Sequence, residues 1–193
     1  MDARAFLTLG RGFPGMAKGA SAVQQTFEED NMMDIETMVA REAIRLVVSI
    51  YNSAVDRGDY ADLEQVFARD GEMIISDEKR LGGRDDIIAK LSAGARSRGA
   101  YEAGNYQRHI LGNSIINVTE ADRAKSVHYI VVMTEKGLDH SGVYIDDFIV
   151  EDGNWRIATR RANMEWARED SRFFTYPGTT FISPVSALDV FQI

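Results

Sequence analysis

Four successive segments near the end of the chain alternate between apolar and polar residues, and this pattern constrains the fold more than any other feature. The segments are YQRHILGNSIINV (106–118), RAKSVHYIVVMTE (123–135), HSGVYIDDFIVED (140–152) and NWRIATRRANM (154–164). A period of two is typical of strands that bury one face of a sheet. The last two segments are separated by Asp152–Gly153, a pair that favours a tight type I′ hairpin. The pattern therefore predicts an antiparallel meander.

Helix-like segments come before these strands. Apolar residues recur with three-four spacing in DIETMVAREAIRLVVSIYNSAVDRGD (34–59), which predicts an amphipathic helix that Gly58 ends. The next predicted elements are a short helix over 59–68, a turn at RDG (69–71), a strand over 72–76 and a third helix over 82–97. Helices followed by a meander predict an α+β domain in which one sheet face packs against the helices.

Composition divides the chain into three parts. The first 33 residues are repeatedly interrupted by glycine and proline, so we interpret 1–33 as a flexible leader and not as a signal peptide. Residues 34–166 form the predicted domain. The segment 167–193 is rich in aromatic residues, and we expect it to pack on the domain or on a neighbouring subunit.

Charge and residue types exclude several classes of function. The net charge of −8 argues against binding to nucleic acid. The chain has no cysteine, which excludes disulfides and thiolate chemistry and is compatible with the cytoplasm, our predicted location. No apolar run is long enough to cross a membrane. The three histidines lack metal-ligand spacing, and the glycines of 9–15 neither follow a strand nor open a helix, so we predict neither metal nor cofactor.

One histidine, His109, lies in the middle of a predicted strand. It is either a satisfied polar residue of the sheet or a group that handles protons, because a neutral imidazole can act as a base near neutral pH. Strand parity predicts that His109, Leu111 and Asn113 share one face. By contrast, His140 is predicted to lie in a loop.

Several segments together resemble the SnoaL-like branch of the NTF2-like superfamily. They are YNSAVDRGDYADLEQVFARDGEM (51–73), GGRDDI (82–87), RHILGNSII (108–116), DRAKSVHYIVV (122–132) and GVYIDDFIVEDGNWRIATR (142–160). The most specific part is the run of Gly-x-Tyr-x-Asp, Asp-Gly and Trp-Arg-Ile in the last segment. The resemblance covers about residues 34–166 and implies an α+β cone, in which three helices pack into a curved, mostly antiparallel sheet with an internal pocket.

The resemblance also implies roles for particular residues. The dehydratase and dehydrochlorinase members have an Asp at the end of the first helix and a His on the strand after the third helix, and these match Asp56 and His109. In those relatives the His is the general base and the Asp orients it. His128 resembles the second pocket histidine of scytalone dehydratases. Those enzymes have a Tyr beside the helix-end Asp, where this chain has Val55.

These residues lead to the hypothesis of a cofactor-independent lyase, dehydratase-like or isomerase-like, that acts on a small, mostly apolar, oxygenated or cyclic molecule. His109 would remove a proton and Asp56 would set its tautomer. Asn113 would bind a substrate oxygen, and Arg161 would anchor an anionic group. The acid for the leaving group remains open among four residues, namely His128, Tyr51, Tyr129 and Tyr144.

Two alternatives stay open beside this hypothesis. The chain could be a module that binds a small ligand without catalysis. It could also be the small subunit of a ring-hydroxylating dioxygenase, which would require a large iron-containing partner. The resemblance further suggests a homodimer or homotrimer.

Overall fold

A computed structural model describes residues 34–76, 79–97, 99–171 and 173. Its helices are α2 (Ile35–Arg57), the short 3-10 helix η1 (Tyr60–Gln65) and α3 (Arg84–Ser97). Its strands are β1 (Phe67–Ser76), β2 (Lys79–Gly82), β3 (Gln107–Glu120), β4 (Arg123–Thr134), β5 (Gly137–Glu151) and β6 (Asn154–Ala167). The predicted leader and nearly all of the predicted C-terminal tail beyond Ala167 lie outside the described residues.

The described strands form one six-stranded sheet with the order β2-β1-β6-β5-β4-β3. All neighbouring strands are antiparallel except β1 and β6, which are parallel. The predicted meander of four strands is therefore confirmed, as is the α+β fold class. Between β5 and β6, Asp152 and Gly153 both have positive φ, 50° and 75°, as a type I′ turn requires.

Two local predictions were wrong, and one strand was not predicted. The turn expected at 69–71 lies inside β1, where the register with β6 shifts between Phe67 and Glu72 and absorbs the extra residues. The edge strand β2 has only four residues, too few to show a period. His140 lies in β5 and is buried, because that strand begins at Gly137, earlier than its alternation indicates.

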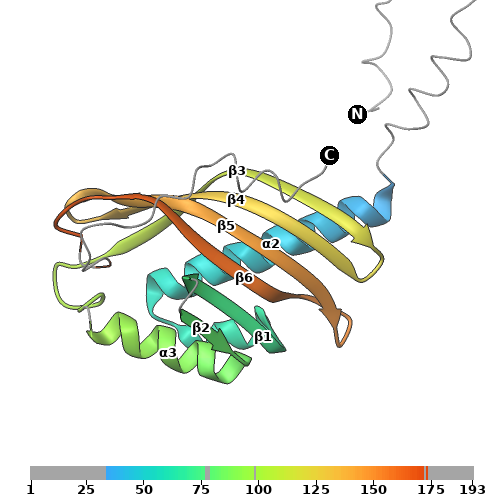
Figure 1. Cartoon of the computed structure of the whole chain (residues 1–193), viewed down its shortest axis with the longest axis horizontal. Coiled ribbons are helices and arrows are strands. Elements are labelled where there is room, and N and C mark those ends of the chain that lie inside the picture. Colours follow the sequence, from blue (N-terminus) through green and yellow to red (C-terminus); the bar gives the residue numbers. More distant parts are fainter. Residues whose placement is uncertain (1–33, 77–78, 98, 172, 174–193) are drawn as a thin grey trace, which may run out of the picture. The chain divides into compact units, whose positions relative to one another are not determined.

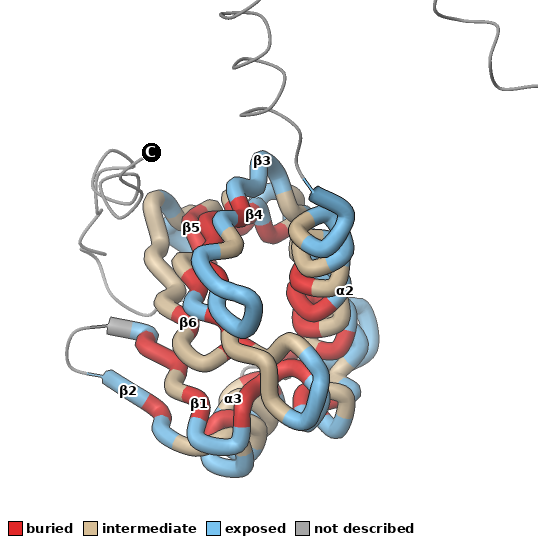
Figure 2. Tube along the Cα trace, turned by 90° about the vertical axis from the view of Figure 1, so that its right-hand side faces the viewer, coloured by how far each residue is buried: buried red, intermediate tan, exposed pale blue. Residues whose placement is uncertain are grey.

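Helix α2 crosses one face of the sheet, which we call the inner face (Figure 1). Seen from the side, buried positions on α2 face buried positions on the strands (Figure 2). The core joins Ile44 and Val48 of α2 to Ile116 of β3 and Phe148 of β5. The three-four spacing of α2 and the period of the strands thus bury one stripe of the helix against one face of the sheet.

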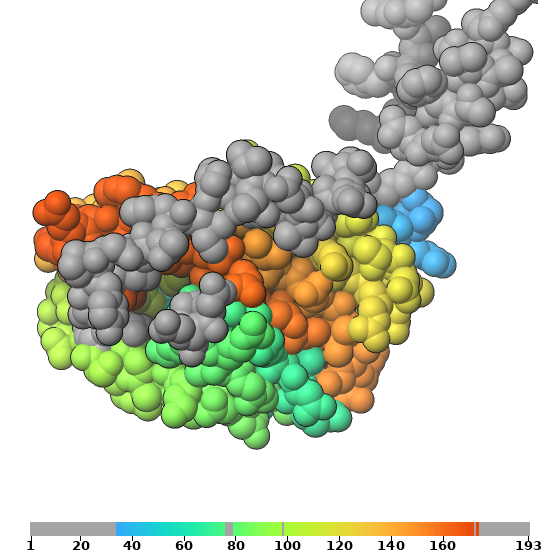
Figure 3. All heavy atoms as spheres, in the orientation of Figure 1, coloured from blue at the N-terminus to red at the C-terminus, as the bar shows by residue number. Residues whose placement is uncertain are grey.

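The remaining helices pack at β1. Leu63 of η1 and Ile87 of α3 join the same core as Phe67 of β1. In the space-filling view the green surface of β1, β2 and α3 borders the orange surface that includes β6 (Figure 3), and β1 is the strand that pairs with β6. No helix in the part of the chain that the structure describes is long and apolar enough to cross a membrane.

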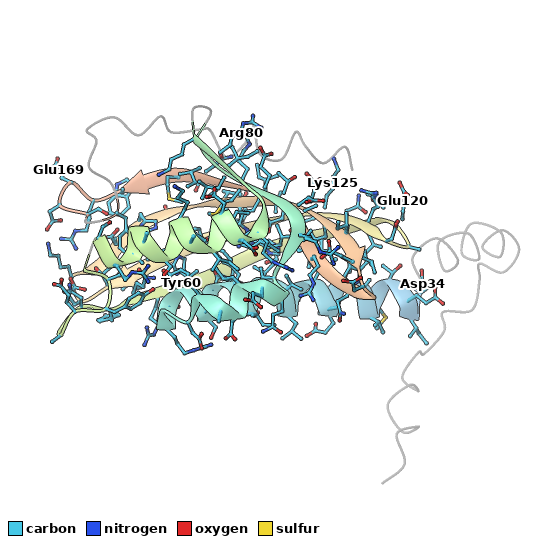
Figure 4. The ribbon with its side chains drawn as sticks, turned by 90° about the horizontal axis from the view of Figure 1, so that it is seen from below. Asp34, Tyr60, Arg80, Glu120, Lys125 and Glu169 are labelled. Atoms are coloured by element: carbon cyan, nitrogen blue, oxygen red, sulfur yellow. The ribbon has the colours of Figure 1, made fainter. Side chains whose placement is uncertain are left out.

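The direction of α2 relative to β3 decides which residues meet. Tyr60, just after α2, and Glu120, the last residue of β3, lie toward opposite ends of the domain (Figure 4). Helix α2 therefore runs antiparallel to β3, and the end of α2 lies beside the beginning of β3. This arrangement brings residues near position 56 to residues near position 109.

Candidate functional site

Asp56 and His109 are in direct contact. The distance from His109 Nδ1 to Asp56 Oδ1 is 2.7 Å. The backbone N–H of His109 also donates to the Asp56 carboxylate, at 3.0 Å from Oδ2. Each of the two side chains is only 10% exposed. The predicted pair therefore forms, with two charge-assisted hydrogen bonds that link α2 to β3.

Neighbouring residues fasten the end of α2 in this position. The backbone carbonyl of Val55 lies in the last turn of α2, where it has no partner within the helix. This carbonyl accepts hydrogen bonds from Gln107 Nε2 and from the Tyr101 hydroxyl. Gly58 ends the helix with φ of 76°. A carboxylate at a helix C-terminus faces an unfavourable dipole, and the two N–H groups of His109 offset this for Asp56.

The contact determines how the imidazole can react. A carboxylate only accepts hydrogen bonds, so the proton of neutral His109 lies on Nδ1 and the lone pair on Nε2. Within the described residues, Nε2 of His109 makes no hydrogen bond. The arrangement can therefore hold a base at Nε2 and stabilise the imidazolium that forms when a proton arrives.

A second His–Asp pair lies two strands away. Val132 of β4 pairs with His109 on one side and with His140 on the other, so both histidines are on the inner face. Two strand spacings separate their Cα atoms by about 10 Å. The distance from His140 Nδ1 to Asp139 Oδ2 is 2.7 Å, and the Ser171 hydroxyl donates to the same oxygen at 2.7 Å.

His128 is buried on the inner face, farther along the sheet. Its Nδ1 lies 2.8 Å from Ser114 Oγ and its Nε2 lies 2.7 Å from Ser126 Oγ. Burial lowers the pKa of His128 to about 4, assisted by the charges of Arg160 and Arg45. His128 is therefore neutral at physiological pH with both ring nitrogens bonded, which makes it a poor proton donor to a substrate.

A buried ion pair explains the Gly-x-Tyr-x-Asp pattern. Asp146 accepts hydrogen bonds from Arg160 Nε at 2.8 Å and Nη2 at 2.6 Å, and neither side chain is exposed. The rings of Tyr51 and Tyr144 each lie 4.2 Å from the guanidinium carbon. Gly142 completes the pattern, because a Cβ there would stand 2.2 Å from the backbone oxygen of Asn163.

This pair also sets the ionisation of its neighbours. Burial opposes the charge of Arg160, but the charge and hydrogen bonds of Asp146 outweigh it and raise the pKa of Arg160 above its usual range. Burial raises the pKa of Tyr51 and of Tyr144, and Arg160 partly opposes both shifts. The two phenols therefore stay protonated, and Tyr51 is a core residue held against Arg160.

Two residues predicted to contact the substrate, Asn113 and Arg161, do not lie on the inner face. The register of β3 with β4 shifts between Leu111 and Ser114, so Ser114 takes the inner position and Asn113 is exposed. The parity prediction for Asn113 was wrong because this bulge inserts a residue. Arg161 pairs with Ile145, whose side chain packs on the opposite face, so the inner arginine is Arg160.

Sequence reasoning missed Asn52 and Gln107. Both residues are buried, at 5% and 2% exposure. Asn52 interrupts the apolar stripe of α2 one turn before Asp56, and Gln107 precedes His109 by two residues on β3, so their spacing was the available signal. In the described ranges no three or more His, Asp or Glu side chains gather in a way that could hold a metal ion.

Comparison with known families places this architecture. The model of the SnoaL-like domain matches residues 36–161, which is most of the chain. The chain belongs to the SnoaL-like domain family. The match spans nearly all of α2 and the sheet as far as Arg161. It includes the pairs Asp56–His109, Asp139–His140 and Asp146–Arg160, but not Ser171. No curated protein matches the sequence.

Solved structures resemble this SnoaL-like chain in fold. A candidate scytalone dehydratase from Novosphingobium aromaticivorans has a TM-score of 0.65 at 18% identity, covering 78% of this chain and 98% of its own. A hexachlorocyclohexane dehydrochlorinase, LinA type 2, has a TM-score of 0.59 at 18% identity, covering 76% of this chain and 99% of its own. The beta subunit of a candidate aromatic-ring-hydroxylating dioxygenase from N. aromaticivorans has a TM-score of 0.55 at 20% identity, covering 68% of this chain and 92% of its own. At these identities the likeness shows the NTF2-like fold.

Proposed function

We propose that this protein is a cofactor-independent lyase of the dehydratase type. The observation that carries the proposal is the 2.7 Å contact between His109 Nδ1 and Asp56, which leaves Nε2 of His109 as a base on the inner face. The named dehydratase and dehydrochlorinase among the structural relatives support elimination chemistry on this fold. The substrate is a small, largely apolar, oxygenated ring.

The reaction needs only groups that the chain supplies. Nε2 of His109 takes a proton from the carbon beside a substrate carbonyl, and the electrons of that C–H bond move into the carbonyl as an enolate. The enolate reforms the carbonyl as hydroxide leaves the next carbon, which creates a C=C bond. The departing hydroxide takes up the proton from the His109 imidazolium, so the products are an enone and water. Asp56 stabilises the imidazolium in between.

The same base also permits isomerisation, in which the proton returns to a different carbon. Binding without catalysis is the competing function, because an inner face lined by polar groups can hold a ligand without reacting. The dioxygenase beta subunit among the relatives shares the fold, but a His–Asp pair whose Nε2 bonds to none of the described residues favours proton transfer.

Turnover of a simple β-hydroxyketone tests the proposal. We expect the protein to convert 3-hydroxycyclohexanone to cyclohexenone and, in D₂O, to exchange the protons beside the carbonyl, both followed by NMR. Replacing His109→Gln or Asp56→Asn should lower these rates by roughly 10²–10⁴-fold. Asp62→Asn is the matched control, because that carboxylate pairs with Arg57 at the surface. Binding of the probe without turnover or exchange would favour the ligand-binding function.

A further inference from the structure

Asn52 has two buried amide atoms, and neither has a hydrogen-bond partner among the residues that the structure describes. Both Nδ2 and Oδ1 are inaccessible to solvent and make no hydrogen bond in the described part of the chain. A buried amide without partners loses its hydration and gains nothing in return, so native proteins rarely keep one. Because both atoms lack a partner, exchanging the positions of N and O would not remove the deficit. The side chain therefore indicates a partner from outside the chain.

The position of Asn52 relates it to the His–Asp pair. Val48, Asn52 and Asp56 are spaced by four residues and form one stripe of α2, and Val48 lies in the core against the sheet. Asn52 precedes Asp56 by one turn, about 5.4 Å along the axis. Since α2 runs antiparallel to β3 (Figures 1 and 4), this step goes from His109 toward Leu111.

Gln107 adds a third atom without a hydrogen-bond partner among the described residues, on the other side of His109. Its Nε2 donates to the carbonyl of Val55 at 2.9 Å, which fixes the amide orientation. Its Oε1 is buried and makes no hydrogen bond within the described residues. Gln107 and His109 are two residues apart on β3 and share a face. One donor and two acceptors therefore flank the His–Asp pair without partners.

We propose that Asn52 is the specificity-determining residue of this site and selects an uncharged hydroxyketone. Its Nδ2 donates to the carbonyl oxygen of the substrate, and its Oδ1 accepts from a hydroxyl. Gln107 Oε1 accepts from a second hydroxyl where the substrate has one. A chlorinated hydrocarbon offers neither a strong acceptor nor a donor, so the site discriminates against substrates of the dehydrochlorinase type.

The same contact contributes to catalysis, an account that rests on the proposed function. Negative charge develops on the carbonyl oxygen as His109 removes the neighbouring proton. A donor that bonds to that oxygen stabilises the enolate more than the ground-state ketone, because the enolate oxygen carries more negative charge. Asn52 then affects both which molecule binds and how fast it reacts.

Binding of two size-matched probes tests the selection directly. We measure Kd by calorimetry for 3-hydroxycyclohexanone and for chlorocyclohexane, with wild type, Asn52→Leu and Asn52→Ala. We expect wild type to prefer the hydroxyketone by at least about tenfold, and the ratio of the two Kd values to fall to about one in both variants. Asn117→Leu is the matched control, since Asn117 is exposed on β3.

The unfolding temperature of the ligand-free protein supplies a second readout. Asn52→Leu replaces two unpartnered polar atoms by an apolar group of similar shape, so its midpoint should rise while selectivity is lost. A merely structural amide, held for example by an internal water, would give a lower midpoint and an unchanged Kd ratio. Either a wild type without preference or a preference that survives in both variants overturns the proposal.

The test of Asn52 can fail or succeed independently of the test of the lyase activity. The Kd ratio is also measured in His109→Gln, where turnover is absent. A preference for the hydroxyketone that depends on Asn52, in a protein that never turns the probe over, supports Asn52 and removes the lyase. Turnover that depends on His109, with a ratio unaffected by Asn52→Leu, supports the lyase and removes the role of Asn52.

Discussion

Asp56 holds His109 at two points, because its carboxylate accepts one hydrogen bond from Nδ1 of the imidazole and another from the backbone N–H of the same residue. The two residues are 53 positions apart in the chain. The double contact fixes the rotation of the ring and joins the end of α2 to β3. A base that is held in this way loses little entropy when it reacts, which is the usual function of such a partner.

Asp56→Asn should reverse the tautomer of His109. In the variant the amide oxygen accepts from the backbone N–H, which turns the amide N–H₂ toward the ring, so Nδ1 must accept and Nε2 must carry the proton. The lone pair needed for proton abstraction is then lost. We expect ¹⁵N chemical shifts of the imidazole to show protonated Nδ1 in wild type and protonated Nε2 in the variant.

Activity should follow the tautomer in this experiment. Turnover of 3-hydroxycyclohexanone falls by roughly 10²–10⁴-fold in Asp56→Asn and stays near the wild-type value in Asp62→Asn. Identical imidazole shifts in wild type and Asp56→Asn would show that the carboxylate does not select the tautomer.

His128 should make the fold sensitive to acid. Its pKa falls from 6.5 to about 4, chiefly through burial, so the unfolded chain binds a proton more readily than the folded one between these values. The neutral ring then contributes stability that is complete above pH 6.5 and is lost as the pH falls to about 4. The full effect is about 3 kcal/mol of unfolding free energy.

Urea unfolding at several pH values measures this contribution. His128→Gln keeps polar contacts available to Ser114 and Ser126 but does not titrate. The difference in unfolding free energy between wild type and variant should therefore shrink, or change sign, as the pH is lowered from 7 toward 4. Parallel curves for the two proteins would contradict a buried neutral imidazole.

The spacing of apolar residues predicted most of the fold, because an element that buries one face has apolar residues at regular intervals along the sequence. The three-four spacing of 34–59 and the alternation of the last four segments correspond to α2 and β3–β6. The parallel pairing of β1 with β6 left no such trace, since it depends on contacts between segments far apart.

The site was predictable only in part. Asp56 and His109 were named through the resemblance, and the structure brings them together. The parity argument failed at Asn113 because a bulge shifts the register without changing the composition. The sequence hypothesis named Arg161, whereas Arg160 is the buried residue, since two adjacent arginines give no signal about which one has a carboxylate partner.

Replacing one member of the Arg160–Asp146 pair should lower the unfolding free energy more than replacing both members. Arg160→Met leaves the Asp146 carboxylate buried without its bidentate partner, and we expect a loss of about 3–5 kcal/mol of unfolding free energy. The double variant Arg160→Met/Asp146→Leu should recover much of this, because no charge remains buried. Urea unfolding of both single variants and the double variant gives the coupling energy, and simple additivity would show that the pair contributes no mutual stabilisation.

Gly142→Ala should destabilise the sheet where Gly112→Ala does not. A Cβ at Gly142 would meet the Asn163 backbone oxygen at 2.2 Å, a contact that a flexible side chain cannot relieve, so β5 and β6 must separate. A Cβ at Gly112 would lie 3.5 Å from the Cβ of Tyr129, an ordinary van der Waals distance. We expect Gly142→Ala to lower the unfolding free energy by about 1–3 kcal/mol and Gly112→Ala to leave it within about 0.5 kcal/mol. Equal stability of the two variants in urea would show that β6 does not approach Gly142 so closely.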